Sequence, residues 1–182
     1  NIPTLIPTYE KVEKIFCGYN SSAFYINGEA YMFGTNFNGQ LGIESKYIFI
    51  PTLLPELDKE FKNNIQKIAF GLSHTLIISN NRLYVCGNNF VGQLGLEESI
   101  QRIDKFINIQ MFNDKNITDI ACGTNNSIVI ADGIAYVSGD NDNGQLGLGH
   151  IEKIYKFTSI PNIYGVVNVE CGESFIALLT SE

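Results

Sequence analysis

The sequence is poor in the features that mark nucleic-acid-binding and membrane proteins. It has 182 residues and a net charge of −7, and its twelve Lys and Arg residues are scattered without a basic cluster. Binding to phosphates needs such a cluster, so direct nucleic-acid binding by this segment is disfavoured. No apolar run reaches the roughly 18–20 residues of a membrane-spanning helix. A basic protein surface, in contrast, would be attracted by the negative charge.

The sequence also offers few groups for catalysis or metal binding. The four cysteines, from Cys17 to Cys171, are too far apart for a metal-ligand spacing and favour buried thiols in a reducing, intracellular compartment, nuclear or cytoplasmic. The segment DNDNG (140–144) is similar to a calcium loop, but Gly144 and Gln145 occupy positions where an EF-hand needs an acceptor and a glycine. No serine or cysteine has a neighbouring base in the sequence. We therefore expect no catalytic residue, cofactor or metal in this segment.

A repeat with a period near 50 residues dominates what is present. Gly18, Gly71, Gly123 and Gly172 mark four copies, and a second glycine follows sixteen residues after each of the first three. The pentapeptide NGQLG stands at 38–42 and 143–147, with VGQLG at 91–95. Insertions occur only between this motif and the next copy. Constant spacing within units and variable spacing between them is typical of stacked supersecondary elements.

Each copy has the pattern of short antiparallel strands. VEKIFC, IQKIAF, ITDIAC and VVNVEC mix apolar and polar residues with a period near two, and each is followed by a second apolar segment. The pairs NG (27–28), NN (80–81) and DG (132–133) then predict two-residue type I′ hairpins before a third strand. A segment such as FIPTLLPEL (49–57) supplies a fourth strand. Four antiparallel strands per copy predict the blades of an all-β propeller, and the best helical pattern, at 96–106, predicts a turn or two of helix.

The GQLG motif lies where the chain reverses between the third and fourth strands, so we interpret it as structural. Its glycines supply backbone freedom, its glutamines can satisfy turn amides, and its leucines can fill the gap between blades. The motif residues assigned to a structural role are Gly39, Gln40, Leu41, Gly42, Gly92, Gln93, Leu94, Gly95, Gly144, Gln145, Leu146 and Gly147.

These copies resemble the regulator of chromosome condensation repeat family. The resemblance rests on IAFGLSHTLII (68–78), CGTNNS (122–127), GTNFNGQLG (34–42) and GDNDNGQLGLGH (139–150), and it covers practically the whole chain. It implies a seven-bladed β-propeller, with roughly three and a half blades in this chain, and a blade-stabilising role for His74. The aromatic residue that the family usually has before the third-strand glycine is Phe33 in the first copy but Cys86 and Ser138 in the others.

The predicted boundaries describe a single partial propeller domain, about half of a longer propeller. Residues 1–11 would form the outer strand of a preceding blade, because IPTLIPTYE matches IPTLLPEL at 50–57. Residues 12–57, 65–112 and 117–163 would each form a blade, and residues 166–182 the first two strands of the next. The open strand edges of such a half favour self-association.

The loops between first and second strands, and those after third strands, are expected to open on one face of the propeller. Aromatic residues dominate interface energies, so Phe37 and Phe90 are candidate anchors, with packing onto a neighbouring blade as the alternative. The predicted partner-binding residues are Tyr19, Asn20, Phe37, Leu72, Ser73, Phe90, Asn125, Asp142 and Glu173.

The sequence therefore predicts a protein–protein interaction scaffold or regulatory module without chemistry of its own. The resemblance implies an alternative, since the family's namesake is a guanine-nucleotide exchange factor for a Ran-type small GTPase and associates with chromatin. In the namesake, the inserted part is an enlarged loop that follows a third strand. In this chain, the loop after the third strand is expected to have the same length in all three copies. A Ran-type GTPase and histones are thus the candidate partners, and no membrane partner is expected.

Overall fold

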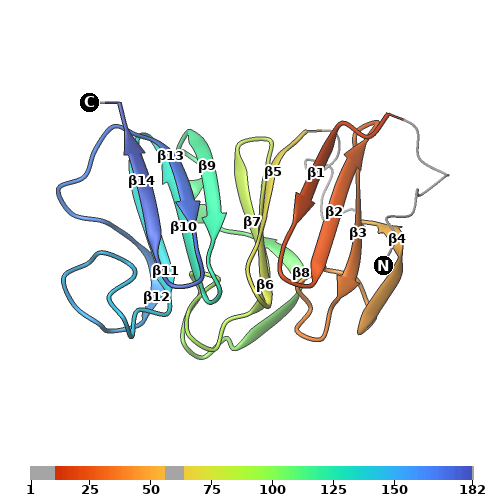
Figure 1. Ribbon diagram of the computed structural model, residues 1–182, viewed down its shortest axis with the longest axis horizontal. Helices are drawn as coiled ribbons and strands as arrows, with labels where there is room; N and C mark the ends of the chain where they lie inside the picture. The colour runs from red at the N-terminus through yellow and green to blue at the C-terminus, as the bar shows by residue number, and fades with distance from the viewer. Residues whose placement is uncertain (1–10, 56–63, 182) are drawn as a thin grey trace.

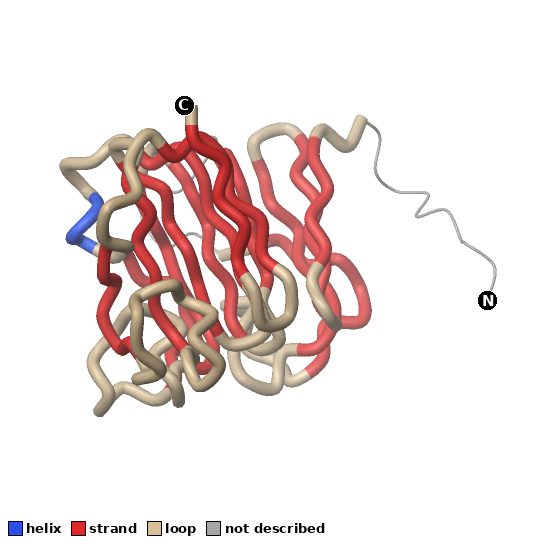
Figure 2. The backbone as a smooth tube through the Cα atoms, turned by 60° about the vertical axis from the view of Figure 1, so that its left-hand side comes forward, coloured by secondary structure: helices blue, strands red, loops and turns tan. Residues whose placement is uncertain are grey.

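The computed structural model describes residues 11–55 and 64–181, which form four antiparallel sheets standing side by side (Figure 1). Strands make up nearly all of the regular structure, with a single short helical turn (Figure 2). We call the sheets blades 1 to 4 in chain order. This arrangement confirms the predicted fold class, an all-β propeller segment of about three and a half blades.

The strands of each blade follow one another in sequence, so each blade is a simple meander. Blade 1 contains β1 (Lys14–Cys17), β2 (Ser21–Ile26), β3 (Glu29–Thr35) and β4 (Tyr47–Leu53). Blade 2 contains β5 (Ile65–Phe70), β6 (His74–Ser79), β7 (Arg82–Asn88) and β8 (Arg102–Asn108), followed by the 3-10 turn η1 (Gln110–Phe112). Blade 3 contains β9 (Ile117–Cys122), β10 (Asn126–Ala131), β11 (Ile134–Gly139) and β12 (Ile154–Ser159), and blade 4 contains β13 (Val166–Cys171) and β14 (Ile176–Thr180).

The first strands of successive blades contact one another, in the order β1, β5, β9 and β13. The fourth strands, β4, β8 and β12, are the opposite edges of their sheets. All loops from first to second strands, and from third to fourth strands, therefore lie at one end of the blades. We call this end the loop end, and the two-residue hairpins lie at the other.

The hairpins between second and third strands have the geometry that their sequences predict. Asn27 and Gly28 have φ values of 51° and 83°, and Asp132 and Gly133 have values of 53° and 71°. The pair at 80–81, although it has no glycine, also has two positive values, 50° and 58°. A type I′ turn requires this conformation at both central residues, and asparagine and aspartate tolerate it.

The prediction of a turn or two of helix at 96–106 is wrong. Residues 102–108 form β8, which pairs with β7, because the third strand of the blade needs a partner along its outer edge. Phe106 is 4% exposed and packs against Gly42 of blade 1, so its burial comes from packing of β8 against the preceding blade. No helix in the described part of the chain is long and apolar enough to cross a bilayer.

Three apolar clusters fill the space between neighbouring blades. One contains Met32 of blade 1 with Ile77 of blade 2, and the others join blades 2 and 3 and blades 3 and 4 in the same way. The motif leucines Leu41, Leu94 and Leu146 are each 0% exposed and belong to one cluster each. Each leucine thus lies between its own blade and the next.

The second glycine of the motif receives the outer strand of the following blade. A Cβ atom at Gly42 or Gly95 would clash with the rings of Phe106 and Phe157. At Gly147 no atom lies within 4 Å of an added Cβ atom, because the described part of blade 4 contains only its first two strands. The predicted outer strand at 1–11 lies partly outside the described residues. So do the predicted end of the first blade at residue 57 and the predicted end of the last blade at residue 182. These boundaries therefore stay predictions.

Candidate functional site: a groove at the loop end

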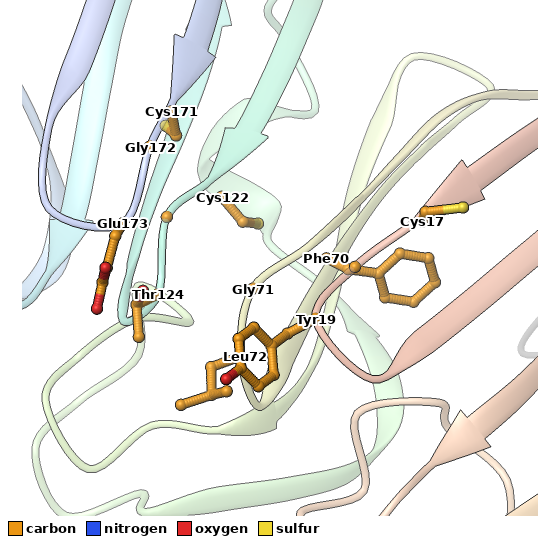
Figure 3. A pocket seen from close by; sticks show the side chains of 12 residues that line it. Cys17, Tyr19, Phe70, Gly71, Leu72, Cys122, Thr124, Cys171, Gly172 and Glu173 are labelled. Atoms are coloured by element: carbon orange, nitrogen blue, oxygen red, sulfur yellow. The ribbon is translucent and has the colours of Figure 1, made fainter.

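The loops between the first and second strands of the four blades meet at the loop end. They comprise residues 18–20, 71–73, 123–125 and 172–175 and surround an open groove of about 580 Å³ (Figure 3). Each blade contributes three consecutive residues, centred on the repeated glycine. The groove is lined by Cys17, Gly18, Tyr19, Phe70, Gly71, Leu72, Cys122, Gly123, Thr124, Cys171, Gly172 and Glu173.

The repeated glycine is needed because successive blades approach one another through their backbones. A Cβ atom on Gly71 would lie 2.9 Å from the carbonyl oxygen of Gly123, and a Cβ atom on Gly123 would lie 2.9 Å from that of Gly172. Only glycine permits so close an approach without a shift of the main chain. The floor of the groove over blades 2 to 4 is therefore largely main chain.

Backbone hydrogen bonds join three of the loops. Leu72 N donates to Thr124 O at 3.1 Å, and Thr124 N donates to Glu173 O at 3.2 Å. At the boundary of blades 1 and 2, Phe70 stands where the other three blades have a cysteine, and it packs against Gly18. The blade 1 end of the groove consequently has an aromatic floor.

The residue after each repeated glycine forms the rim of the groove. Tyr19 is 77% exposed and Leu72 is 39% exposed, and the Tyr19 ring lies beside Leu72 (Figure 3). Thr124 and Glu173 continue the rim on blades 3 and 4. The rim thus changes from apolar at one end to a carboxylate at the other. Sequence reasoning finds Tyr19, Leu72 and Glu173 but misses Thr124, although its offset after the glycine is the same.

The residue two positions after the repeated glycine has a structural contact in blades 1 to 3. The carbonyl oxygens of Asn20, Ser73 and Asn125 accept hydrogen bonds, at 2.8–2.9 Å, from the amides that end the third strands or follow them. None of the three residues lines the groove. They lie beside it and fix the loops, and a partner contact for them stays a prediction.

The three candidates in the loops after third strands lie outside the groove. Phe37 is 43% exposed, and its ring meets that of Tyr47, in the same blade, edge-on at 4.6 Å. Phe90 is 58% exposed. Asp142 forms an ion pair with Lys153 at 3.7 Å. A partner contact for these three residues stays a prediction.

A buried asparagine organises each loop after a third strand, and sequence reasoning misses it. Asn36, Asn89 and Asn141 are 3%, 0% and 0% exposed. Their Oδ1 atoms accept hydrogen bonds from the main-chain N of the motif leucine at 2.8, 2.9 and 3.0 Å. Their Nδ2 groups donate to carbonyls across the loop, for example from Asn89 to Ile100 O at 2.6 Å. The available signal is the fixed position of these asparagines, three residues before the first glycine of the motif.

The motif glutamine stabilises each turn, and in blades 1 and 2 it also joins the turn to the next blade. The Oε1 atoms of the three glutamines accept hydrogen bonds, at 2.9–3.1 Å, from the amide two residues earlier. The carbonyl of Gln40 also accepts a hydrogen bond from Thr75 Oγ1, and that of Gln93 accepts one from Ser127 Oγ, both at 2.6 Å. The motif therefore reverses the chain and holds neighbouring blades together.

His74 belongs to the same contact between blades 2 and 3. Its Nε2 lies 2.9 Å from Ser127 Oγ. Because this hydroxyl donates its proton to the carbonyl of Gln93, it accepts a hydrogen bond from His74 Nε2. Burial lowers the pKa of His74 from its ordinary value of 6.5 to about 4, so the ring is neutral near pH 7. A buried, neutral imidazole in this place supports the structure.

The groove is suited to binding by shape and charge. Within residues 11–55 and 64–181, no three His, Cys, Asp or Glu side chains are grouped to hold a metal ion. Burial raises the pKa of Cys171 to about 12 and also raises that of Cys122, so both thiols are neutral and poorly nucleophilic. In the acidic segment at 140–144, Asp140 accepts hydrogen bonds from Asp142 N and Gln145 Nε2 and thereby caps its own turn.

The repeats match a known family model over most of the chain. The model described as "Regulator of chromosome condensation (RCC1) repeat" matches residues 27–78, 80–130 and 132–179, and a second model of the same description matches 65–93. The chain belongs to this family. Each matched segment starts in a two-residue hairpin or directly after one, then covers two strands of one blade and two of the next. A sequence repeat of the family thus joins halves of adjacent blades.

Curated relatives cover most of this chain, while the chain covers a small part of them. The X-linked retinitis pigmentosa GTPase regulator of Homo sapiens is 36% identical over 143 residues, which are 76% of this chain and 14% of that protein. The RCC1-like G exchanging factor-like protein of Homo sapiens is 27% identical, over 90% of this chain and 39% of the relative. The chain therefore spans less than half the length of these relatives.

Solved structures agree in fold. Prp20p from Saccharomyces cerevisiae, described together with its binding properties to Gsp1p and histones, superposes with a TM-score of 0.80 at 23% identity, over 93% of this chain and 44% of that one. Within this common fold, the loops after third strands here are residues 36–46, 89–101 and 140–153. The prediction that this loop has the same length in all three copies is therefore wrong. The spacing up to the GQLG motif is constant, but the segment between the motif and the fourth strand varies in length.

Proposed function

We propose that this chain is part of a protein–protein interaction scaffold or regulatory module and carries out no covalent chemistry itself. The observation that carries the proposal is the groove at the loop end, where Tyr19 and Leu72 are exposed beside the Phe70 floor. Exposed aromatic and apolar groups on a rigid support bind a partner with little loss of conformational entropy. A propeller alone fixes no function, so the proposal rests on this site.

A photo-crosslinking amino acid at position 124 tests this function. Thr124 lies in the middle of the groove, and Tyr164, which is 70% exposed in the turn after β12, provides a control position at the opposite end. We expect the crosslinker at position 124 to capture a specific protein that the crosslinker at position 164 does not capture. Equal capture from both ends, or none from the groove, would contradict the proposal.

Guanine-nucleotide exchange on a Ran-type small GTPase is a second candidate function. It is supported by the name of the human G exchanging factor-like relative and by the common fold with Prp20p. Exchange would proceed by insertion of a loop that displaces the nucleotide phosphates and Mg²⁺, with no covalent step. The test is the release of a fluorescent nucleotide from a Ran-type GTPase, measured with this chain and with the longer protein. If neither accelerates release, this candidate is eliminated.

Histones and a second copy of the chain are further candidate partners, in the nucleus or the cytoplasm. Histones are basic, and the net charge of −7 would attract them. Self-association is favoured by the two-stranded sheet of blade 4, in which β14 is an edge strand paired with β13 in the described part of the chain. Light scattering over a range of protein concentrations tests self-association. Pull-down with purified histones at two salt concentrations tests histone binding.

A further inference from the structure

We propose that the groove binds an extended, basic peptide segment that carries an apolar anchor residue. The inference rests on the proposed interaction function and names the chemistry of the partner. The apolar side chain lies between Tyr19 and Leu72, and a Lys or Arg side chain of the same segment lies beside Glu173. Three observations carry it. The loop end is negatively charged, one end of the groove is apolar while the other is acidic, and main-chain groups of the groove floor are already hydrogen-bonded to one another.

The loops of the loop end account for most of the net charge of the chain. Its loops are the four around the groove and the three that follow third strands, at 36–46, 89–101 and 140–153. They contain seven carboxylates and two lysines, a net charge of −5 against −7 for the whole chain. These residues are Glu44, Glu97, Glu98, Asp140, Asp142, Glu152 and Glu173, with Lys46 and Lys153. A cationic segment is therefore steered to this end and an anionic one is repelled.

Glu173 brings this charge into the groove itself. Three carboxylates of the outer loops have lysine partners at 2.7–3.7 Å, whereas no ion pair within the described residues involves Glu173. It is the one charged side chain among the twelve lining residues. Cys122 and Cys171, which lie beside it, are neutral thiols. An unpaired carboxylate with uncharged neighbours attracts a cation more strongly than one surrounded by counter-charges.

The opposite end of the groove suits an apolar side chain. Phe70, which is 9% exposed, forms the floor, and Tyr19 and Leu72 stand beside it with 77% and 39% of their surfaces exposed (Figure 3). Burial of exposed apolar surface stabilises a complex by roughly 25 cal/mol per Å². A partner with only charged residues would leave this surface in water, so the anchor is a necessary part of the ligand.

The floor is not available for addition of a partner strand. The amide groups of Leu72 and Thr124 donate to the carbonyls of Thr124 and Glu173, so two donors and two acceptors of the floor are already bonded to each other. Recognition by β-strand addition needs free groups of this kind. The peptide is consequently held by side chains along the rim, which requires only a few extended residues.

Fluorescence anisotropy with a labelled synthetic peptide tests the proposal. The probe is fluorescein-Gly-Arg-Lys-Leu-Phe-Lys-Arg-Gly, in which basic residues flank the anchor on both sides so that chain direction does not matter. One control peptide has Glu in place of every Arg and Lys, and a second has Ser in place of Leu and Phe. We expect the probe to bind about tenfold or more tightly than either control. Raising the salt concentration should weaken binding of the probe.

Matched variants of the protein locate the binding. Glu173→Gln is compared with Asp114→Asn, which removes an exposed carboxylate after η1 at the other end. Tyr19→Ala is compared with Tyr164→Ala, since the two tyrosines are 77% and 70% exposed. We expect Glu173→Gln to weaken Kd about fivefold and Tyr19→Ala about tenfold, with both control variants unchanged. Circular dichroism melts verify that all four variants fold.

The proposal is overturned if the acidic or the serine peptide binds as well as the probe, or if the control variants lose as much affinity as the groove variants. Failure of this inference is distinguishable from failure of the proposed function. If crosslinking at Thr124 captures a protein partner while the probe peptide does not bind, the interaction function stands and the basic-peptide assignment is wrong.

Discussion

Lys67 Nζ lies 2.5 Å from Asp119 Oδ1, and the two residues occupy the same position of the repeat in neighbouring blades, four residues before the repeated glycine. Asp119 is 6% exposed and also accepts a hydrogen bond from Val169 N of blade 4 at 3.2 Å. In blade 1 the same position is held by Lys14, whose Nζ donates to Ile65 O at 2.8 Å. One buried carboxylate therefore joins blades 2, 3 and 4 along their first strands.

Replacing this carboxylate should destabilise the protein as a whole. Asp119→Ala leaves Lys67 and Val169 N without their shared acceptor, so we expect the free energy of unfolding to fall by about 2–3 kcal/mol in urea denaturation. The matched control is Asp142→Ala, which breaks the exposed pair with Lys153 and should cost about 0.5 kcal/mol or less. Equal losses in the two variants would show that Asp119 does not join the blades.

The buried asparagines of the motif loops should be as important as the glycines. Asn89→Ala removes the acceptor for Leu94 N and the donor to Ile100 O at a position that is 0% exposed. We expect a loss of about 2–3 kcal/mol in the free energy of unfolding. Asn143→Ala, at an exposed position of the equivalent loop in blade 3, is the control and should change stability by about 0.5 kcal/mol or less. A mild effect of Asn89→Ala would contradict the role assigned to these side chains.

His74 should make stability depend on pH in a defined window. Its pKa is about 4 in the folded protein against an ordinary value of 6.5, so the unfolded chain binds the proton more readily. The contribution is present above pH 6.5 and is lost as the pH falls toward 4. It amounts to about 3 kcal/mol over the full window.

The variant His74→Asn isolates this contribution, since asparagine occupies the equivalent position, Asn126, in blade 3. Denaturant titrations at several pH values between 4 and 7 should show a shallower fall in stability for His74→Asn than for the unmodified chain. Identical slopes for the two proteins would mean that His74 is not buried in the neutral form.

The cysteines should differ sharply in reactivity. Cys17 is exposed, whereas Cys86 is buried and burial raises the pKa of Cys171 to about 12. At pH 8 only roughly one in ten thousand Cys171 thiols is then ionised. Intact-mass analysis with iodoacetamide should show one fast adduct, which Cys17→Ser abolishes, and four adducts after denaturation. Fast modification of Cys122 or Cys171 in the folded chain would contradict the packing of the groove floor.

The blades could be predicted because their signals are local and repeated. Asn27-Gly28 and Asp132-Gly133 indicate their turns by residue type alone, and alternation of apolar residues indicates the strands beside them. The segment at 96–106 was assigned wrongly because its composition favours helix, while pairing with β7 decides its conformation. Tertiary contact overrides propensity in such a segment.

The candidate site was accessible to sequence reasoning only in part. Tyr19, Leu72 and Glu173 follow from a common offset after the repeated glycine, because equal offsets in stacked blades place residues on one face. The packing of Phe70 against Gly18 and the ion pair of Lys67 with Asp119 depend on how blades pack against each other. Side-chain pairing between residues one repeat apart is not specified by periodicity.

Hydrogen exchange of the chain with and without its crosslinked partner, after purification of that partner, tests most directly whether the loop end is the binding surface. We expect added protection of amides in 18–20, 71–73, 123–125 and 172–175, and no change in the hairpins at 27–28, 80–81 and 132–133 at the opposite end. Protection confined to the hairpin end, with exchange in the four loops unchanged, would contradict the assignment of the groove as the site.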